Sequence, residues 1–205
     1  MRSDIILYIK NVANIMNLNK EKLIDMDQVV GDGDLGLTMT DGFEAAYKAI
    51  QDSDEMDIGK LIYLGGKAMA NAVPSTMGTL MASGLMQAAK NLRGETEMTL
   101  ENWIIFFESY EAGVMNRGKA KVGEKTFIDG IDPAVQCLKK HEEDDLYTLS
   151  IATLIAAKEG FQNTTSMIAV HGRAATRGKA SIKLEDPGAY VAVLLFEAFK
   201  ETMNK

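Results

Sequence analysis

A helical repeat is clearest in Trp103-Ile104-Ile105-Phe106-Phe107-Glu108-Ser109-Tyr110-Glu111-Ala112-Gly113-Val114. Large apolar residues recur in it at i, i+3, i+4, i+7 and i+11, which are Trp103, Phe106, Phe107, Tyr110 and Val114. Residues at this spacing share one face of an α-helix. The stretch therefore predicts an amphipathic helix whose aromatic face is buried in a core.

The same period returns on both sides of this stretch. It predicts helices over residues 5–16, with Ser3 as the N-cap, and over 77–85 and 147–155. Further helices are expected over 37–52, 58–70, 126–139 and 164–170, and the stretches 25–36, 71–76, 117–125 and 171–187 are expected to be loops that alternate with the helices. Asp186-Pro187 opens the last helix, which extends to about Glu201, as an N-cap followed by a first-turn proline. With no segment that alternates with period two, we expect an all-α fold of about eight helices in a single domain, residues 1–205.

Composition excludes several classes of protein. The 205 residues carry 29 acidic and 22 basic side chains, a formal net charge of -7, which argues against nucleic-acid binding. Cys137 is the single cysteine and there are two histidines, too few for a disulfide framework or a structural zinc site. Asp4 and Lys10 interrupt the first apolar run, so we expect no signal peptide, no membrane span and a cytoplasmic location.

The most distinctive local feature is the acidic stretch 27–39, which contains Asp27, Asp32 and Asp34. Glycines at 31, 33 and 36 permit the tight turns that aim three carboxylates at one point. Such hard oxygen ligands suit magnesium or calcium, but an EF-hand is excluded because glycine and glutamate are missing at its sixth and twelfth places. The plainer alternative is a solvated acidic turn before the next helix, and we expect Asp25 to be only a solvated neighbour.

A helix start near residues 36–38 would bring unpaired amides next to these carboxylates, and the combination predicts a metal–nucleotide site. Other nucleotide motifs fail. The P-loop spacing at 113–120 has Ala120 in place of the metal-binding hydroxyl and follows a predicted helix, and no protein-kinase triplet occurs. His171 is expected to be structural, not a phosphate carrier.

Four ordered motifs resemble the L subunit of the dihydroxyacetone kinases over most of the chain. They are Asp27 with Gly31-Asp32-Gly33-Asp34-x-Gly36; Gly78-Thr79; Arg117-Gly118-Lys119-Ala120-x-x-Gly123-x-Lys125-Thr126; and Gly172-Arg173-Ala174 with Asp186-Pro187-Gly188-Ala189. The resemblance implies a closed barrel of eight antiparallel helices, with a nucleotide–magnesium site formed by loops at one end. No general base in this chain is required.

The resemblance also implies ligands. Two Mg²⁺ ions would be held by Asp27, Asp32 and Asp34, and would grip the phosphates of ADP or ATP. The implied nucleotide-binding residues are Gly36, Thr38, Gly118, Phe127, Arg173, Asp186, Pro187 and Gly188. At the second loop, Val73-Pro74 replaces the family's phosphate-contacting Ser-Gly, and Ser75 and Thr76 are expected to substitute for it.

The resemblance further implies a partner, because the family's short ketose, dihydroxyacetone or a related triose or tetrulose, is held by a separate K-type subunit. A phosphohistidine phosphotransferase protein is a second expected partner in one version, whereas ATP exchanges in the other, and a homodimer or hetero-oligomer is expected. Arg177, Lys179 and Lys183 would face that partner or form a solvated basic surface. Leu35, where the family often has His, and Val73-Pro74 favour the alternative of a non-catalytic nucleotide-binding regulator or assembly partner.

Overall fold

The computed structural model describes residues 2–140 and 145–204, with the side chain of residue 2 left out. This part of the chain is helical throughout and contains no strand, which confirms the all-α prediction. Two 3-10 helices, η1 (Thr164–Ser166) and η2 (Arg173–Ser181), lie between α8 and α9. The α-helices are α1 (Arg2–Leu18), α2 (Lys20–Val30), α3 (Leu35–Ile50), α4 (Ile58–Ala72), α5 (Thr76–Asn91), α6 (Leu100–Gly118), α7 (Phe127–Lys140), α8 (Leu146–Asn163) and α9 (Pro187–Met203).

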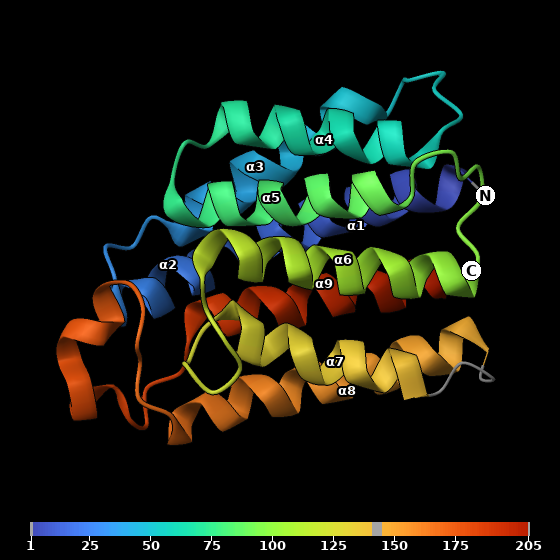
Figure 1. The fold of residues 1–205 in the computed structure, drawn as a ribbon. Coiled ribbons are helices and arrows are strands. Elements are labelled where there is room, and N and C mark those ends of the chain that lie inside the picture. Colours follow the sequence, from blue (N-terminus) through green and yellow to red (C-terminus); the bar gives the residue numbers. More distant parts are fainter. Residues whose placement is uncertain (1, 141–144, 205) are drawn as a thin grey trace.

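The helices pack as a ring around a common core (Figure 1). Contacts run in order through α1, α3, α4, α5, α6, α7, α8 and α9, and then from α9 back to α1. The short helix α2 stands outside this circuit and contacts α1, α3, α9 and η2. As a result, the links that follow α2, α4, α6 and α8 come together at one end of the ring (Figure 1).

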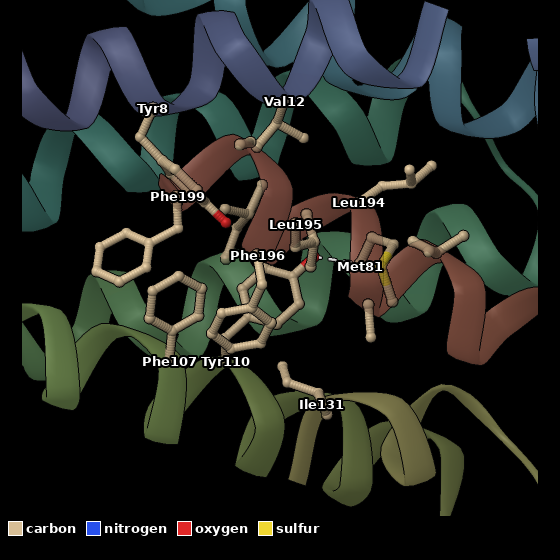
Figure 2. Close-up of a cluster of buried hydrophobic side chains, with 14 of the residues drawn as sticks. Tyr8, Val12, Met81, Phe107, Tyr110, Ile131, Leu194, Leu195, Phe196 and Phe199 are labelled. Atoms are coloured by element: carbon tan, nitrogen blue, oxygen red, sulfur yellow. Dashed lines mark hydrogen bonds between the residues drawn. The ribbon is translucent and has the colours of Figure 1, made fainter. Parts of the chain in front are cut away.

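An aromatic cluster fills the ring where α1, α6 and α9 meet (Figure 2). Phe107 of α6 stacks on Phe196 of α9 with ring centroids 4.6 Å apart, and Tyr8 of α1 meets Trp103 edge-on at 5.3 Å. All four side chains are buried, as the helical spacing predicts for Tyr8, Trp103 and Phe107. Burying side chains of this size contributes about 2–3 kcal/mol each, so this cluster fixes the three helices relative to one another.

Polar residues mark where the helices begin. Asp186 precedes α9, and its Oδ1 accepts a hydrogen bond from the Ala189 N–H at 2.7 Å, which confirms the predicted N-cap. Ser75 caps α5 in the same way by accepting from the Gly78 N–H at 3.0 Å. The cap predicted at Ser3 is wrong, because α1 already includes residues 2 and 3.

Two predicted elements differ from the structure. The stretch 25–36 was expected to be a loop, but α2 continues through Val30 and only a short link separates it from α3, because Leu23 and Val30 are buried. The predicted helix 164–170 is a single 3-10 turn. There the hydroxyls of Thr164 and Ser166 donate to the carbonyls of Phe161 and Asn163, which competes with helix continuation.

None of the described helices combines the length and the hydropathy that a membrane span requires.

Candidate functional site

Three aspartates converge in the short link between α2 and α3. Asp27 lies in the last turn of α2, Asp32 lies in the link, and Asp34 immediately precedes α3. One carboxylate oxygen from each lies within 4.8 Å of the others. The turn thus brings together the three residues predicted to hold metal.

The backbone of the link is folded around the Asp27 carboxylate. Asp27 Oδ2 accepts hydrogen bonds from the N–H groups of Gly33 at 2.9 Å and Leu35 at 3.4 Å. A Cβ at Gly31 would lie 2.1 Å from Asp27 Oδ1, and Gly33 has a φ of +78°, so both positions require glycine. The glycines of the acidic stretch therefore set the position of the first carboxylate.

Negative charge is in excess at this cluster. Desolvation raises the pKa of Asp34, and the neighbouring Asp32 and Asp27 carboxylates raise it further, whereas Arg173 lowers it. Arg173 supplies a nearby cation, with its Nη2 2.7 Å from Asp32 Oδ2. A compact set of hard oxygen donors that repel one another suits a divalent cation such as Mg²⁺.

The acidic cluster lies in the wall of an open pocket with a volume of about 750 Å³. Residues from the C-terminal ends of α2 and α6, from the starts of α3, α5 and α7, and from the segment before α9 line it. Among the predicted site residues, those that line the pocket are Asp27, Asp32, Asp34, Ser75, Thr76, Gly118, Phe127, Arg173, Asp186, Pro187 and Gly188.

Gly36 and Thr38 do not line this pocket. Gly36 faces α2, where a Cβ would lie 2.3 Å from the Lys20 carbonyl oxygen, so close helix packing explains the glycine. The Thr38 side chain is buried, and its N–H donates to the Asp34 carbonyl at 2.9 Å inside the first turn of α3. The helix begins at Leu35, which turns both residues away from the open space.

The start of α5 provides polar groups on another part of the wall. Ser75 and Thr76 lie at its N-terminus, after Val73 and Pro74. The Ser75 N–H donates to the Val73 carbonyl at 2.8 Å, and Gly78 permits this turn because a Cβ there would lie 2.3 Å from the same carbonyl oxygen. A helix N-terminus with free amides is suited to an anion such as phosphate.

An apolar wall completes the pocket. Leu80 of α5, Val114 of α6 and Phe127 of α7 contribute to it. Gly118 lies against Leu80, since a Cβ at Gly118 would come within 3.1 Å of Leu80 Cδ2. The pocket thus combines an apolar surface with a few polar groups, as small-molecule sites do.

Sequence reasoning assigned no role to Lys125, which also lines the pocket. Its side chain is 2% exposed, and its Nζ donates to the carbonyls of Thr164 and Leu184, both at 2.5 Å. Desolvation lowers its pKa, while the nearby Asp186 and Asp129 raise it. Burial raises the pKa of Asp186 to about 7. Lys125 belongs to the motif that begins at Arg117, but nothing in the sequence indicates that its ammonium is buried.

His171 lies at the edge of the pocket and has a structural partner. Its Nε2 is 2.6 Å from Glu124 Oε2, and this contact is the leading cause of a lowered Glu124 pKa. The pair links the segment after α8 to the loop between α6 and α7. Arg177 makes a similar link by donating to the Val29 carbonyl of α2.

Comparisons with known proteins identify the family of this chain. The family model described as "DAK2 domain" matches residues 29–201. The PEP-dependent dihydroxyacetone kinase 1, ADP-binding subunit DhaL, of Listeria innocua is 34% identical over 184 residues, covering 90% of this chain and 88% of the relative. The corresponding ADP-binding subunit DhaL of Escherichia coli is 30% identical over 199 residues, covering 96% and 94%.

A solved structure has the same fold. The dihydroxyacetone kinase from C. freundii in complex with AMP-PNP and Mg²⁺ superimposes with a TM-score of 0.72 at 22% identity. The match covers 95% of this chain but 33% of that protein, so the present chain spans about a third of its length. The family model matches more than half of the chain, from the end of α2 into α9, and the chain belongs to the DAK2 domain family.

Proposed function

We propose that this chain is the ADP- or ATP-binding subunit of a dihydroxyacetone-type kinase. The observation that carries the proposal is the convergence of Asp27, Asp32 and Asp34 beside a pocket of about 750 Å³. The two relatives that match this chain over most of their length are named as ADP-binding subunits. In this proposal residues 1–205 form one domain, a closed barrel that carries its nucleotide–magnesium site at one end.

The two kinds of pocket wall suit the two ends of a nucleotide. The apolar side chains of Leu80, Val114 and Phe127 match the faces of a purine base. The start of α5 at Ser75 and the guanidinium of Arg173 offer hydrogen bonds and positive charge to phosphates. Gly118, Thr76 and the Asp186-Pro187-Gly188 turn would close the pocket around the ligand.

The acidic residues fit magnesium on chemical grounds. Asp27, Asp32 and Asp34 repel one another, and their oxygens are the ligand type that Mg²⁺ prefers. Two bound ions would supply the positive charge that stabilises the phosphates and the phosphoryl group in transfer. The aspartates themselves hold the ions at the pocket wall, and no side chain of this chain is required as a general base.

The proposed reaction moves the terminal phosphoryl group of the nucleotide to the terminal hydroxyl of a short ketose, such as dihydroxyacetone or a tetrulose. The ketose would be bound by a K-type subunit in the cytoplasm, so this chain would act in a hetero-oligomer or as a homodimer that meets that subunit. The names of the relatives include "PEP-dependent", which supports a phosphohistidine protein as the phosphate donor.

A regulatory or assembly role is the alternative, and Leu35 favours it. This residue is 3% exposed and lines the pocket, where an apolar side chain cannot donate a hydrogen bond to phosphate. Val73-Pro74 before α5 also favours the regulatory role, because proline lacks an N–H and cannot donate a hydrogen bond to phosphate. Phosphoryl transfer to dihydroxyacetone or a tetrulose, assayed with K-type and phosphohistidine partners, separates the two roles: ADP binding without transfer would favour the regulator.

Calorimetry of ADP binding in the presence of Mg²⁺ tests the site directly. Asp32→Ala should abolish binding, since one of three converging ligands is lost. Asp25→Ala is the matched control, because Asp25 is an exposed residue of α2 outside the cluster. Unchanged ADP affinity in Asp32→Ala would exclude the proposed site.

A further inference from the structure

The rim segment, residues 164–186, joins α8 to α9 and carries much of the pocket wall. His171, Arg173 and Asp186 belong to it. The segment contains only two 3-10 helices. Three hydrogen bonds join its two halves, from the Lys183 N–H to the Thr165 carbonyl at 2.8 Å, from the Ala169 N–H to Ser181 Oγ at 2.9 Å and from the Asp186 N–H to Thr164 Oγ1 at 3.3 Å. Its position at the pocket therefore depends on contacts with other parts of the chain.

Arg173 and Arg177 contact Asp32 and the Val29 carbonyl on the α2 side, and two consecutive residues of the loop between α6 and α7 provide four further contacts. The Glu124 carbonyl accepts from the Val170 N–H at 3.2 Å, and its carboxylate pairs with His171. Lys125 adds hydrogen bonds to the carbonyls of Thr164 and Leu184, which lie near the two ends of the rim segment. One ammonium thus holds both ends of the segment beside α7.

The chemistry of Lys125 is unusual for a lysine. Its ammonium is buried, yet its hydrogen-bond acceptors are main-chain carbonyls and not carboxylates. Burying a cation costs free energy, which here is offset by the two charge-assisted bonds and by the charges of Asp186 and Asp129 nearby. The backbone of Lys125 has a φ of +61°, in the left-handed region that costs free energy for a residue with a side chain.

We propose that Lys125 is a positioning residue, which holds the rim segment in the conformation that places Arg173 and Asp186 at the nucleotide pocket. The proposal rests on the proposed nucleotide-binding function. In this role Lys125 acts through the rim segment. The acidic cluster on the α2–α3 link does not depend on it, since no hydrogen bond joins Lys125 to Asp27, Asp32 or Asp34 among the described residues.

This separation distinguishes positioning from a general effect on stability. When the ammonium group of Lys125 is removed, the rim segment should loosen, while α1, α4 and α5 keep their packing. ADP binding, which uses the rim segment, should weaken. Binding of Mg²⁺ alone should not weaken, because its proposed ligands lie on the α2–α3 link and the rim segment contributes only Arg173, which competes with the metal for Asp32. A general loss of stability would instead raise backbone exchange in all helices.

The experiment compares Lys125→Met with Lys121→Met, the same change at an exposed position of the same loop. Amide hydrogen exchange of the ligand-free proteins should show faster exchange within residues 164–186 in Lys125→Met alone. Calorimetry should show ADP affinity in the presence of Mg²⁺ reduced about tenfold, which corresponds to ~1.4 kcal/mol, with no loss of Mg²⁺ affinity. Lys121→Met should match the wild type in all three measurements.

Unchanged exchange in the rim segment of Lys125→Met would overturn the proposal, and so would faster exchange with unchanged ADP affinity. If Lys125→Met does not fold, Lys125→Gln, which keeps an uncharged donor and most of the side-chain length, should change exchange and ADP affinity in the same directions. Failure of the wild type to bind ADP would contradict the proposed function, and with it the role of Lys125 in nucleotide binding. Faster exchange confined to residues 164–186 in Lys125→Met would still show that Lys125 anchors the rim segment.

Discussion

Arg173 Nη2 lies 2.7 Å from Asp32 Oδ2, so a guanidinium pairs with one of the three carboxylates of the acidic cluster. The two side chains are 69% and 46% exposed, respectively, and an ion pair this open to solvent contributes less than about 1 kcal/mol. A divalent cation can therefore compete for Asp32. Arg173 would then be available to the phosphates of a ligand in the same pocket.

Arg173→Met should change two affinities in opposite directions. Binding of Mg²⁺ alone should become about twofold to fivefold tighter, because a competing positive charge is removed from a partly screened site. Binding of ADP in the presence of Mg²⁺ should weaken by about tenfold, because a charge-assisted bond to phosphate is lost. Calorimetric titrations with Mg²⁺ alone and with ADP plus Mg²⁺ measure the two effects.

Lys179→Met is the matched control for this prediction. It removes a positive charge from the same 3-10 helix, η2, at an exposed side chain outside the pocket lining. Both affinities should stay within about twofold of the wild type, since charges separated by solvent are largely screened. If Arg173→Met shifted both affinities in the same direction, the competition between arginine and metal would be disproved.

Gly33→Ala should weaken Mg²⁺ binding as well as stability. Gly33 has a φ of +78° and donates its N–H to Asp27 Oδ2, so an altered backbone there moves a metal ligand. Gly94→Ala is the control for backbone strain alone: its φ of +93° carries a cost of about 1 kcal/mol, and a Cβ there meets no atom within 4 Å, whereas a Cβ at Gly33 would also lie 2.7 Å from Gln28 Cγ. Thermal unfolding should show a loss for both that is at least as large for Gly33→Ala, and calorimetry a loss of Mg²⁺ affinity for Gly33→Ala only; equal Mg²⁺ affinities would contradict this prediction.

The helical fold was predictable because the apolar spacing is strong. The repeat from Trp103 to Val114 predicts a buried face, and the structure buries that face against α1 and α9. Helix α2 was missed because its apolar content is low and its end carries the acidic residues that indicate a loop. The 3-10 turn at Thr164 was predicted as a helix because periodicity does not report hydroxyl groups that bond back to the main chain.

The site was predictable where the chemistry is local. Asp27, Asp32 and Asp34 are close in sequence, and glycines between them indicate a turn, so their convergence followed from spacing. Gly36 was expected at phosphate, but the structure places it against α2, a packing role that spacing alone does not reveal. Lys125 was missed because its partners, the carbonyls of Thr164 and Leu184, are distant in sequence and carry no side-chain signal.

The N-cap of α9 offers a test at the pocket rim. Asp186→Ala removes the acceptor of the Ala189 N–H and should lower stability by about 1–2 kcal/mol, whereas Asp186→Asn keeps a capping oxygen and should lose less. For a chain of this size, the loss in Asp186→Ala corresponds to a fall of about 2–8 °C in the unfolding temperature. At pH 6 most Asp186 of the wild type is protonated and therefore neutral, as both replacements are; equal unfolding temperatures for Asp186→Ala and Asp186→Asn would rule out capping as the main role.

A buried carboxyl between α6 and α7 should make stability depend on pH. Glu111 is 7% exposed, and burial, together with Asp132 of α7 and Glu108, raises its pKa to about 8 from 4.5. Between pH 4.5 and pH 8, Glu111 is therefore protonated in the folded protein and ionised in the unfolded chain. This contribution to stability is fully present below pH 4.5 and is lost as the pH rises through 8.

Glu111→Gln removes the titration and keeps a similar shape. At pH 9 the variant should be more stable than the wild type by about 2 kcal/mol, or roughly 4–8 °C in the unfolding temperature, and this advantage should shrink toward zero at pH 4.5. Thermal unfolding of the variant and the wild type across this pH range gives the difference between their unfolding temperatures. Other groups that titrate equally in both proteins do not contribute to this difference.

Glu108→Gln separates this effect from the loss of a surface ion pair. Glu108 contacts Lys139 of α7 at 2.5 Å, but both side chains are substantially exposed, so its loss should cost less than about 1 kcal/mol. Its effect should vary less with pH than that of Glu111→Gln, because burial and Asp132 raise the pKa of Glu111 more than Glu108 does. An advantage of Glu111→Gln that did not grow with pH would contradict the buried-proton explanation. A stability difference that increases with pH would show that a buried negative charge on Glu111 destabilises the packing of α6 against α7 at alkaline pH. The loop that connects these two helices carries Lys125.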